Sequence, residues 1–195
     1  MNKNILLAFL AIPAFYFSHA QTKKFDSTLK MGDVGYRVTC YNKKTENNAV
    51  TIRPIGFKDY SKPFDIPVIG VFEKALIDDF NDDGFPDLVF YSFDDKDRAQ
   101  IYAIASVSNK SCAPIYVPDI YIEPKIRNGY EGHDELTSMG GFLIRKFPVY
   151  QTDSTTKNTS VIGTRVIEYK AKSNTSNPDN PTFKFEVFKS YDMKQ

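Results

Sequence analysis

The chain is divided into short apolar runs that are separated by turn-forming residues. Val, Ile, Phe and Tyr are concentrated in the runs, and Gly, Pro, Asn and Asp lie between them. Where apolar and polar residues alternate, one side of a strand can face a core and the other can face water. The pattern predicts strands at Gly35–Tyr41, Ala49–Phe57, Val71–Ile77, Leu88–Phe93, Ala99–Val107, Ile115–Val117, Gly141–Tyr150, Ser160–Lys170 and Thr182–Tyr191.

These strands predict a mostly β fold, an antiparallel β-sandwich or barrel-like domain with little helix. The connection at 171–181 is rich in Ser, Asn and Pro, so the last two predicted strands should form a hairpin. Only residues 117–126 could hold a turn of helix, which their two prolines limit. No internal repeat or long linker divides the sequence, and we expect a single domain at 33–195 after a polar lead at 21–32.

The first twenty residues have the pattern of a secretory signal peptide. Lys3 supplies a positive charge, residues 5–17 are almost wholly apolar, and Ser18 and Ala20 place small residues before a cut at Gln21. The apolar segment is shorter than the roughly 20 residues that cross a bilayer. Because no cysteine follows the cut, no lipid anchor is expected either. We therefore expect an exported protein, periplasmic or secreted, without a membrane anchor.

The charge balance bears on the choice of partner. Loss of Lys3 with the signal peptide reduces the 25 basic residues to 24, which equals the 24 acidic residues. A chain of zero net charge without a basic run is a poor partner for nucleic acid or an anionic membrane. We expect it to bind another protein or a glycan instead.

Two cysteines, Cys40 and Cys112, lie in or beside predicted strands. In an oxidising compartment an even pair favours a disulfide that joins two strands, with two free buried thiols as the alternative. The chain has no Cys-x-x-Cys, so redox catalysis is not indicated.

The most specific motif is the aspartate loop, residues 79–87. Oxygen-bearing side chains stand at positions 1, 3, 5 and 9 of this segment, and Gly84 at position 6 permits a sharp turn. The candidate calcium ligands are Asp79, Asn81, Asp83, the backbone carbonyl of Phe85, and Asp87. The spacing resembles the calcium loops of integrin-type β repeats, and Phe90 at position 12 excludes an EF-hand. A calcium ion here would be structural, and an Asx-rich turn without metal is the alternative.

Catalytic constellations are missing from the sequence. His133 is the single histidine that follows the signal peptide, so a two-histidine zinc site cannot form. No Gly-x-Ser-x-Gly segment offers a serine nucleophile. A loop histidine beside Asp134 is the simpler interpretation, and we expect a binding protein and no enzyme.

The predicted strands near the C-terminus carry candidate recognition residues. Arg145, Tyr150 and Arg165 would form a patch if they faced outward, because arginine and tyrosine are enriched at binding surfaces. A solvated sheet face is the alternative.

Four segments, at 79–90, 129–135, 142–150 and 163–170, together give the chain a family resemblance. The chain resembles the periplasmic inhibitors of invertebrate-type lysozyme over residues 33–191, most specifically in the aspartate loop and the strand after it.

The resemblance implies a small β-sandwich-like domain that plugs a lysozyme cleft with a loop. The inhibitors carry a Ser-Gly-x-Tyr loop in the hairpin after the aspartate motif, and this chain has Phe93–Tyr102 at that position. The candidate binding residues there are Asp94, Asp95, Asp97 and Tyr102. A carbohydrate or cell-surface binding module with a calcium loop is the alternative function.

Overall fold

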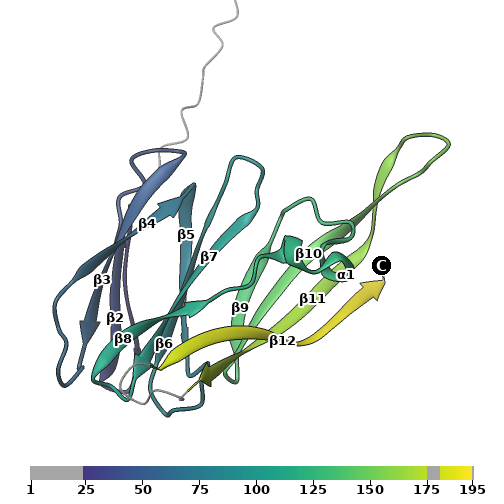
Figure 1. Cartoon of the computed structure of the whole chain (residues 1–195). Helices are drawn as coiled ribbons and strands as arrows, with labels where there is room; N and C mark the ends of the chain where they lie inside the picture. The colour runs from purple at the N-terminus through teal and green to yellow at the C-terminus, as the bar shows by residue number, and fades with distance from the viewer. Residues whose placement is uncertain (1–23, 175–180, 195) are drawn as a thin grey trace, which may run out of the picture.

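Strands account for most of the computed structural model, which describes residues 24–174 and 181–194 (Figure 1). They are β1 (Phe25–Met31), β2 (Val34–Cys40), β3 (Asn47–Ile55), β4 (Phe64–Ile69), β5 (Val71–Asp78), β6 (Asp87–Phe93), β7 (Ala99–Val107), β8 (Ser111–Tyr116), β9 (Glu135–Met139), β10 (Phe142–Thr152), β11 (Thr159–Asn174) and β12 (Thr182–Lys194). A 3₁₀ turn, η1 (Ile120–Ile122), and a four-residue helix, α1 (Pro124–Arg127), lie between β8 and β9. The predicted mostly β fold with little helix is confirmed.

The strands form two sheets. β1 to β4 make an antiparallel four-stranded sheet, and the eight-stranded sheet has the order β5-β6-β7-β8-β12-β11-β10-β9. The predicted hairpin is confirmed by the antiparallel pairing of β11 with β12. β8 and β12 run parallel and pair only through Phe183 with Ile115 and Lys184 with Tyr116. The large sheet curls until β5 lies near β9, which makes a nearly closed barrel (Figure 1).

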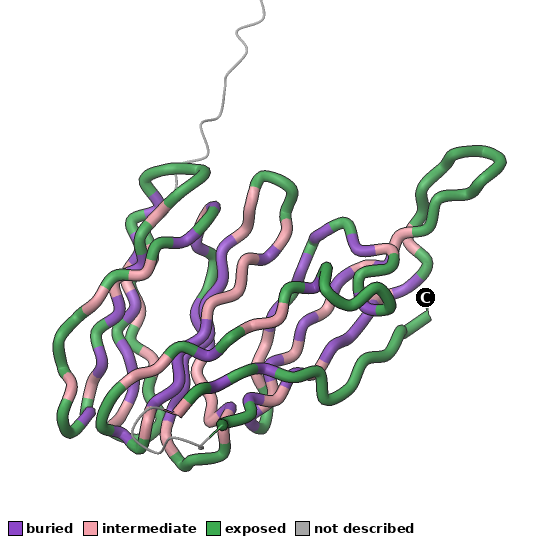
Figure 2. Tube along the Cα trace, viewed as in Figure 1, coloured by how far each residue is buried: buried purple, intermediate pink, exposed green. Residues whose placement is uncertain are grey.

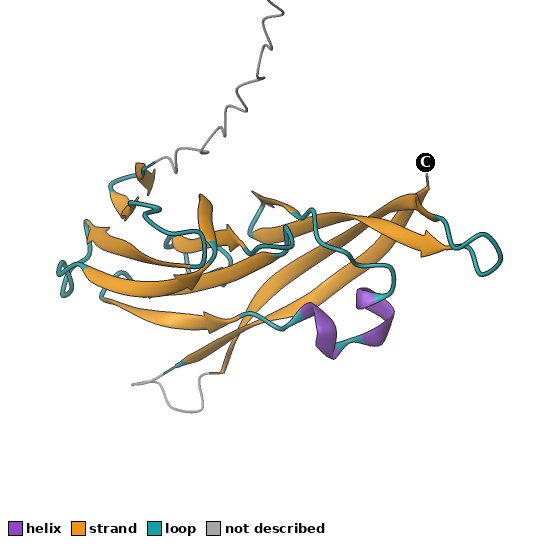
Figure 3. Ribbon diagram, turned by 90° about the horizontal axis from the view of Figure 1, so that it is seen from above, coloured by secondary structure: helices purple, strands orange, loops and turns teal. Residues whose placement is uncertain are grey.

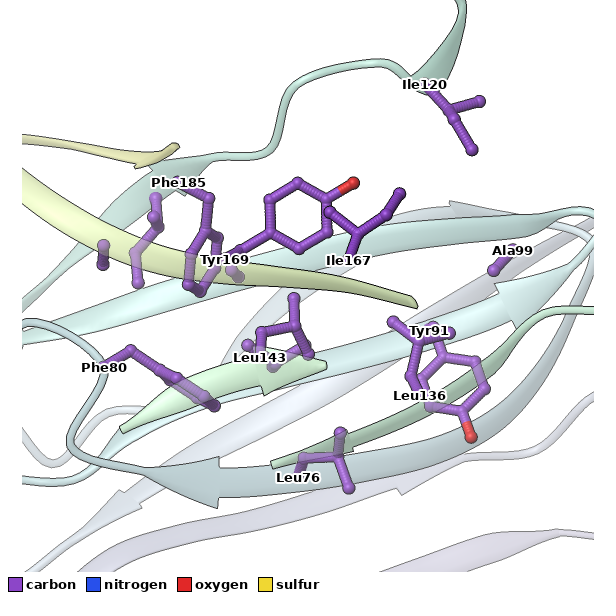
Figure 4. Packing of buried hydrophobic residues seen from close by; sticks show 14 of the residues in the cluster. Leu76, Phe80, Tyr91, Ala99, Ile120, Leu136, Leu143, Ile167, Tyr169 and Phe185 are labelled. Atoms are coloured by element: carbon purple, nitrogen blue, oxygen red, sulfur yellow. The ribbon is translucent and has the colours of Figure 1, made fainter. Parts of the chain in front are cut away.

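Two cores lie on opposite sides of β6. Val89 and Tyr91 belong to the barrel core, whereas Leu88 and Phe90 belong to the core between the two sheets. Both faces of β6 are covered, which explains why its residues 88–91 are continuously apolar and do not alternate. Figure 4 shows part of the barrel core, including Leu76, Phe80, Leu143, Ile167, Tyr169 and Phe185.

The alternating pattern sets the inner face of the barrel along β10. Leu143, Arg145, Phe147 and Val149 are buried, and the residues between them are partly exposed. Figure 2 shows the same alternation of buried and partly exposed positions along this strand. One polar residue, Arg145, therefore points into the barrel with three apolar ones.

Three strands are not predicted by the sequence pattern, and all three lie at sheet edges. β1 falls inside the expected polar lead at 21–32, β4 contains Pro67, and β9 has only five residues. An edge strand has a neighbour on one side only, so its sequence tolerates proline and more polar residues. The hydrophobic pattern is correspondingly weak there.

The short helical segment covers one side of the eight-stranded sheet (Figure 3). The Asp119 carboxylate accepts the backbone N–H of Tyr121 at 2.9 Å and so caps η1. Pro124 is the first residue of α1. A backbone N–H at this position has no partner within the helix, so the absence of one in proline costs no hydrogen bond. Ile120 and Ile126 are buried in the barrel core, so this segment closes part of it.

The predicted signal peptide, residues 1–20, lies outside the described residues. Within the described ranges, neither helix is long and apolar enough to cross a membrane.

The predicted disulfide is wrong, because Cys40 and Cys112 are free thiols. Cys112 lies within hydrogen-bond reach of the Tyr36 hydroxyl, and the Cys40 thiol contacts Asn42 Oδ1 at 3.4 Å. Tyr36 and Cys40 are four residues apart on β2, about 13 Å along an extended strand. The two cysteines therefore reach different ends of the inter-sheet core, whereas a disulfide needs Cα atoms within about 7 Å.

Candidate functional site

The aspartate loop joins β5 to β6 and is folded by its own side chains. Asp79 Oδ1 and Asn81 Oδ1 both accept the backbone N–H of Asp83 at 3.0 Å, and Asp79 Oδ2 accepts that of Gly84 at 2.9 Å. Asp83 Oδ1 accepts the N–H of Phe85 at 2.9 Å. Gly84 has a φ of +83°, a conformation that favours glycine. Three of the four predicted ligand side chains are thus gathered around one turn.

Asp87, the fourth predicted side chain, faces inward and fixes the loop to the barrel. Its Oδ2 accepts the backbone N–H groups of Phe80 at 2.9 Å and Asn81 at 3.1 Å, and its Oδ1 accepts that of Ser106 in β7 at 2.9 Å. Burial raises the pKa of Asp87 to about 7, although the N–H of Ser106 favours the charged form. The carboxylate is therefore a structural anchor whether or not a cation is bound.

The donor set suits calcium chemically, because calcium takes hard oxygen ligands. Each carboxylate oxygen of Asp79 and Asp83 keeps a second lone pair besides the one that accepts an N–H, whereas Asp87 Oδ2 already accepts two N–H groups. In the part of the chain that the structure describes, no group of three or more His, Cys, Asp or Glu side chains is placed to hold a metal ion. Calcium binding stays a prediction.

The turn of the β6–β7 hairpin is held by Asp94. Asp94 Oδ1 accepts the backbone N–H groups of Lys96 at 2.9 Å and Arg98 at 3.1 Å, and Oδ2 accepts Arg98 Nε at 2.8 Å. Burial opposes the charged form, but the hydrogen bonds from Arg98 hold the pKa of Asp94 below its usual value. Asp95, Lys96 and Asp97 are exposed. These three residues, called the hairpin tip below, present charged side chains on a fixed turn.

The loop between α1 and β9 supports the hairpin tip from behind. The backbone N–H of His133 donates to the carbonyl of Asp97 at 2.7 Å. A Cβ atom at Gly132 would lie 2.7 Å from the carbonyl oxygens of Lys96 and Asp97, so only glycine allows this approach. His133 Nδ1 lies 3.5 Å from Asp97 Oδ2, and its side chain is 54% exposed. His133 is thus a surface residue that helps to hold the tip.

Asp134 anchors this supporting loop inside the barrel. Its carboxylate accepts Arg145 Nε at 2.6 Å and Nη2 at 3.0 Å, the Tyr130 hydroxyl at 2.6 Å, and the backbone N–H of Ala99 at 2.8 Å. The side chains of Arg145 and Asp134 are 4% and 0% exposed. Burial alone would lower the pKa of Arg145, but Asp134 raises it above its usual value. Ala99 begins β7, so the network connects the loop directly to the hairpin.

The predicted outward patch of Arg145, Tyr150 and Arg165 is not formed as expected. Arg145 and Arg165 are buried, and Tyr150 is half-buried with its ring 6.3 Å from that of His133. Arg165 Nε and Nη2 donate to the two carboxylate oxygens of Asp192 at 2.7 and 2.8 Å. Arg165 Nη1 also donates to the backbone carbonyls of Lys125, Ile126 and Asn128. Both arginines therefore hold loops on the barrel.

Tyr102, another predicted binding residue, joins the two sheets. Its hydroxyl accepts the backbone N–H of Ile69 in β4 at 2.9 Å. Its ring stacks on Phe90 with the centroids 5.3 Å apart and the planes 8° from parallel. Of the predicted hairpin residues, Asp94 and Tyr102 are structural, whereas the side chains of Asp95 and Asp97 are exposed at the tip.

A polar cleft beside the hairpin was not predicted from the sequence. It has a volume of about 340 Å³, and its walls include Arg98, Gln100, Tyr121, Tyr130 and Arg145. Arg98 Nη1 donates to the Tyr121 hydroxyl at 3.3 Å. Because Asp94 and Arg98 are four residues apart at the hairpin, the sequence could have indicated that Arg98 pairs with Asp94. Nothing local in the sequence indicates that the helical segment forms the other wall of the cleft.

Comparison of the chain with protein-family models, with curated proteins and with solved structures finds no match. The class that the fold defines is a β-rich protein with a curled eight-stranded sheet and a second, four-stranded sheet.

Proposed function

We propose that the chain is an exported β-rich binding protein that inserts the tip of its β6–β7 hairpin into a cleft of another protein. The partner that we propose is a lysozyme, on the basis of the resemblance to inhibitors of the invertebrate-type enzyme. One observation carries the proposal: the hairpin tip is exposed and charged, while its backbone is bonded from behind by the loop that contains His133 and Asp134.

A fixed tip favours binding because ordering a loop on association costs free energy. The β10–β11 hairpin provides a comparison within the same chain. Its residues 151–160 are all exposed, its Asp153 carboxylate accepts the N–H groups of Thr155 and Thr156, and Figure 1 shows it projecting away from the barrel. It is exposed in the same way but is bonded within itself. We therefore assign binding to the β6–β7 tip.

Inhibition of an invertebrate-type lysozyme by the chain from Gln21 onward tests this assignment. Lys96→Glu changes the β6–β7 tip, and Lys157→Glu makes the same change at the β10–β11 turn, where the lysine is also exposed. We expect the wild type and Lys157→Glu to inhibit the lysozyme. Lys96→Glu should inhibit it about tenfold more weakly, which corresponds to a loss of about 1.4 kcal/mol of binding free energy. Equal inhibition by the two variants, or none by the wild type, would contradict the proposal.

The proposal includes one structural calcium ion in the aspartate loop. Asp79, Asn81, Asp83 and Asp87 with the carbonyl of Phe85 would hold it, and the ion would neutralise the negative charge concentrated there. The crowding of side-chain oxygens around the N–H groups of residues 83–85 supports this proposal.

No catalytic residue is assigned in this proposal. The hydrogen-bonded residues described above act on the loops of the chain itself, and His133 supports the hairpin tip. The export that the proposal requires is supported by the signal-peptide pattern of residues 1–20.

A carbohydrate or cell-surface ligand is the second candidate, favoured by the polar cleft beside the hairpin. Tyr121 and Arg98 provide a ring face and charged donors in one wall, a combination that suits a polar ring-shaped ligand. Titration with peptidoglycan-type oligosaccharides, followed by calorimetry, tests it. Tyr121→Ala should abolish the heat of binding, whereas Tyr41→Ala, at a comparably exposed tyrosine elsewhere, should not. Absence of heat with the wild type would refute this candidate.

A further inference from the structure

We propose that a second cleft, between β4 of the small sheet and β7–β8 of the large sheet, binds an uncharged apolar small molecule that has one polar end. This cleft is separate from the hairpin tip, and the inference goes beyond the proposed function. Its volume is about 660 Å³, within the range of roughly 300–1,000 Å³ that is typical of small-molecule sites.

The cleft is an unfilled part of the inter-sheet core. Phe64 and Ile66 of β4 pair with Ile52 and Val50 of β3, which are fully buried, so all four side chains belong to the inward face. Phe64 and Ile66 are nevertheless half-exposed. Val68, on the same face two residues further, is only 2% exposed. The core between the sheets is therefore closed at one end of β4 and open at the other.

The pairing of the strands explains why nothing covers the open end. β4 is the last strand of the small sheet, and β8 pairs with β12 through two residue pairs only, at Ile115 and Tyr116. Cys112 of β8, which packs on the inter-sheet core, consequently stays partly exposed in the wall of the cleft. At the closed end, the Tyr102 hydroxyl is bonded to the N–H of Ile69. A ligand would enter from the other end.

The composition of the walls determines the chemical class of the ligand. None of the fourteen lining residues is charged, and most are aliphatic or aromatic. A buried charge on the ligand would have no partner there and would be costly. Among the lining residues, Tyr60 and Tyr116 carry hydroxyls, which can bond a single hydroxyl or carbonyl of a ligand. The complementary ligand is therefore apolar along its length and neutral at its polar end.

A peptide strand is a poorer occupant than a small molecule. An added strand needs free backbone N–H groups along the edge that it joins. In β4, Pro67 has no N–H and that of Ile69 already donates to Tyr102, and in β8 Pro114 has none. The edges of the cleft therefore offer an added strand few donors.

Fluorescence titration of the mature chain with N-phenyl-1-naphthylamine, an uncharged apolar dye, tests the proposal. We expect enhanced, saturable emission that dodecan-1-ol reverses at lower concentration than dodecanoate does. Ile66→Trp fills the cleft from β4, and Ile69→Trp makes the same change at an exposed position on the outer face of the same strand. Ile66→Trp should weaken dye binding about tenfold or more, and Ile69→Trp should leave it unchanged. No saturable emission, or equal binding by the two variants, would overturn the proposal.

A second measurement avoids dependence on the folding of a variant. In the native wild-type chain, dodecan-1-ol should slow the alkylation of Cys112, as followed by mass spectrometry of its peptide, because the thiol lies in the wall of the cleft. An unchanged alkylation rate at a saturating alcohol concentration would overturn the proposal. So would a dye signal that is lost on dilution together with a dimer, because a second copy would then be the occupant.

Discussion

The fold should be strongly destabilised when the hydrogen-bonded network around Asp134 is broken at one partner. Asp134→Ala removes a carboxylate that accepts four hydrogen bonds, and it leaves the guanidinium of Arg145 buried without a counter-charge. Removing one partner of a buried ion pair costs about 3–5 kcal/mol. For a chain of this length, each kcal/mol lowers the melting temperature by about 2–4 °C. We therefore expect a decrease of roughly 6–20 °C in the melting temperature of the variant.

Urea denaturation with a double-mutant cycle measures this loss. Arg145→Met should also destabilise, and the double variant should lose less than the sum of the two single variants, because neither charge is then left alone. Asp26→Ala is the matched control, since Asp26 also accepts Nε and Nη2 of an arginine, Arg37, but on the surface. The control should lose much less stability, because solvent screens exposed pairs.

The reasoning is refuted if Asp134→Ala lies within about 1 kcal/mol of the wild type. It is also refuted if the free-energy losses of the two single variants are simply additive. Either result would mean that the buried pair of Asp134 and Arg145 contributes no more than an exposed one, and the hairpin tip would then lack the rigid support that the proposed function requires.

Three further predictions follow from other parts of the fold. Two thiols per chain, Cys40 and Cys112, should react with a thiol reagent in denaturant without reductant. In the native state at pH 8, Cys112 should react slowly, because burial raises its pKa to about 11 and leaves little thiolate. A count of zero free thiols would show that Cys40 and Cys112 form the disulfide after all. Calcium at a hundredfold excess over its dissociation constant should stabilise the chain by about 2.7 kcal/mol relative to chelator, and Asp83→Ala should abolish this difference; superimposed melting curves of the wild type would contradict calcium binding. Arg165→Ala should cost about 1.5–3 kcal/mol of stability and accelerate hydrogen exchange in the segment 125–128, where the carbonyls of Lys125, Ile126 and Asn128 lose their donor. Unchanged exchange there would contradict the role of Arg165.

The β class could be predicted from the sequence because most interior strands have a clear hydrophobic signal. β6 is the clearest case, with an apolar run that both cores require. The edge strands β1, β4 and β9 could not be predicted in this way, because they need few apolar residues on a half-covered surface. The parallel pairing of β8 with β12 could not be predicted from the sequence either, because it joins segments that are distant in the chain.

The predictions about the site failed where the direction of a side chain mattered. Arg145 lies in an alternating strand, and the pattern around it places it on the inner face with Leu143 and Phe147. An arginine is rarely buried without a partner, and the partner Asp134 is on another element. The buried role of Arg145 therefore depends on a tertiary contact that the local sequence does not contain. The aspartate loop was predictable as a turn, because its bonds are local.

The central claim is that the hairpin tip is the surface that meets a partner protein. Hydrogen-exchange mass spectrometry of the chain from Gln21 onward, with and without a saturating invertebrate-type lysozyme, tests it most directly. The account predicts added protection in peptides that cover 93–100 and unchanged exchange in peptides that cover 152–159. Protection confined to 152–159, or no protection anywhere, would contradict it.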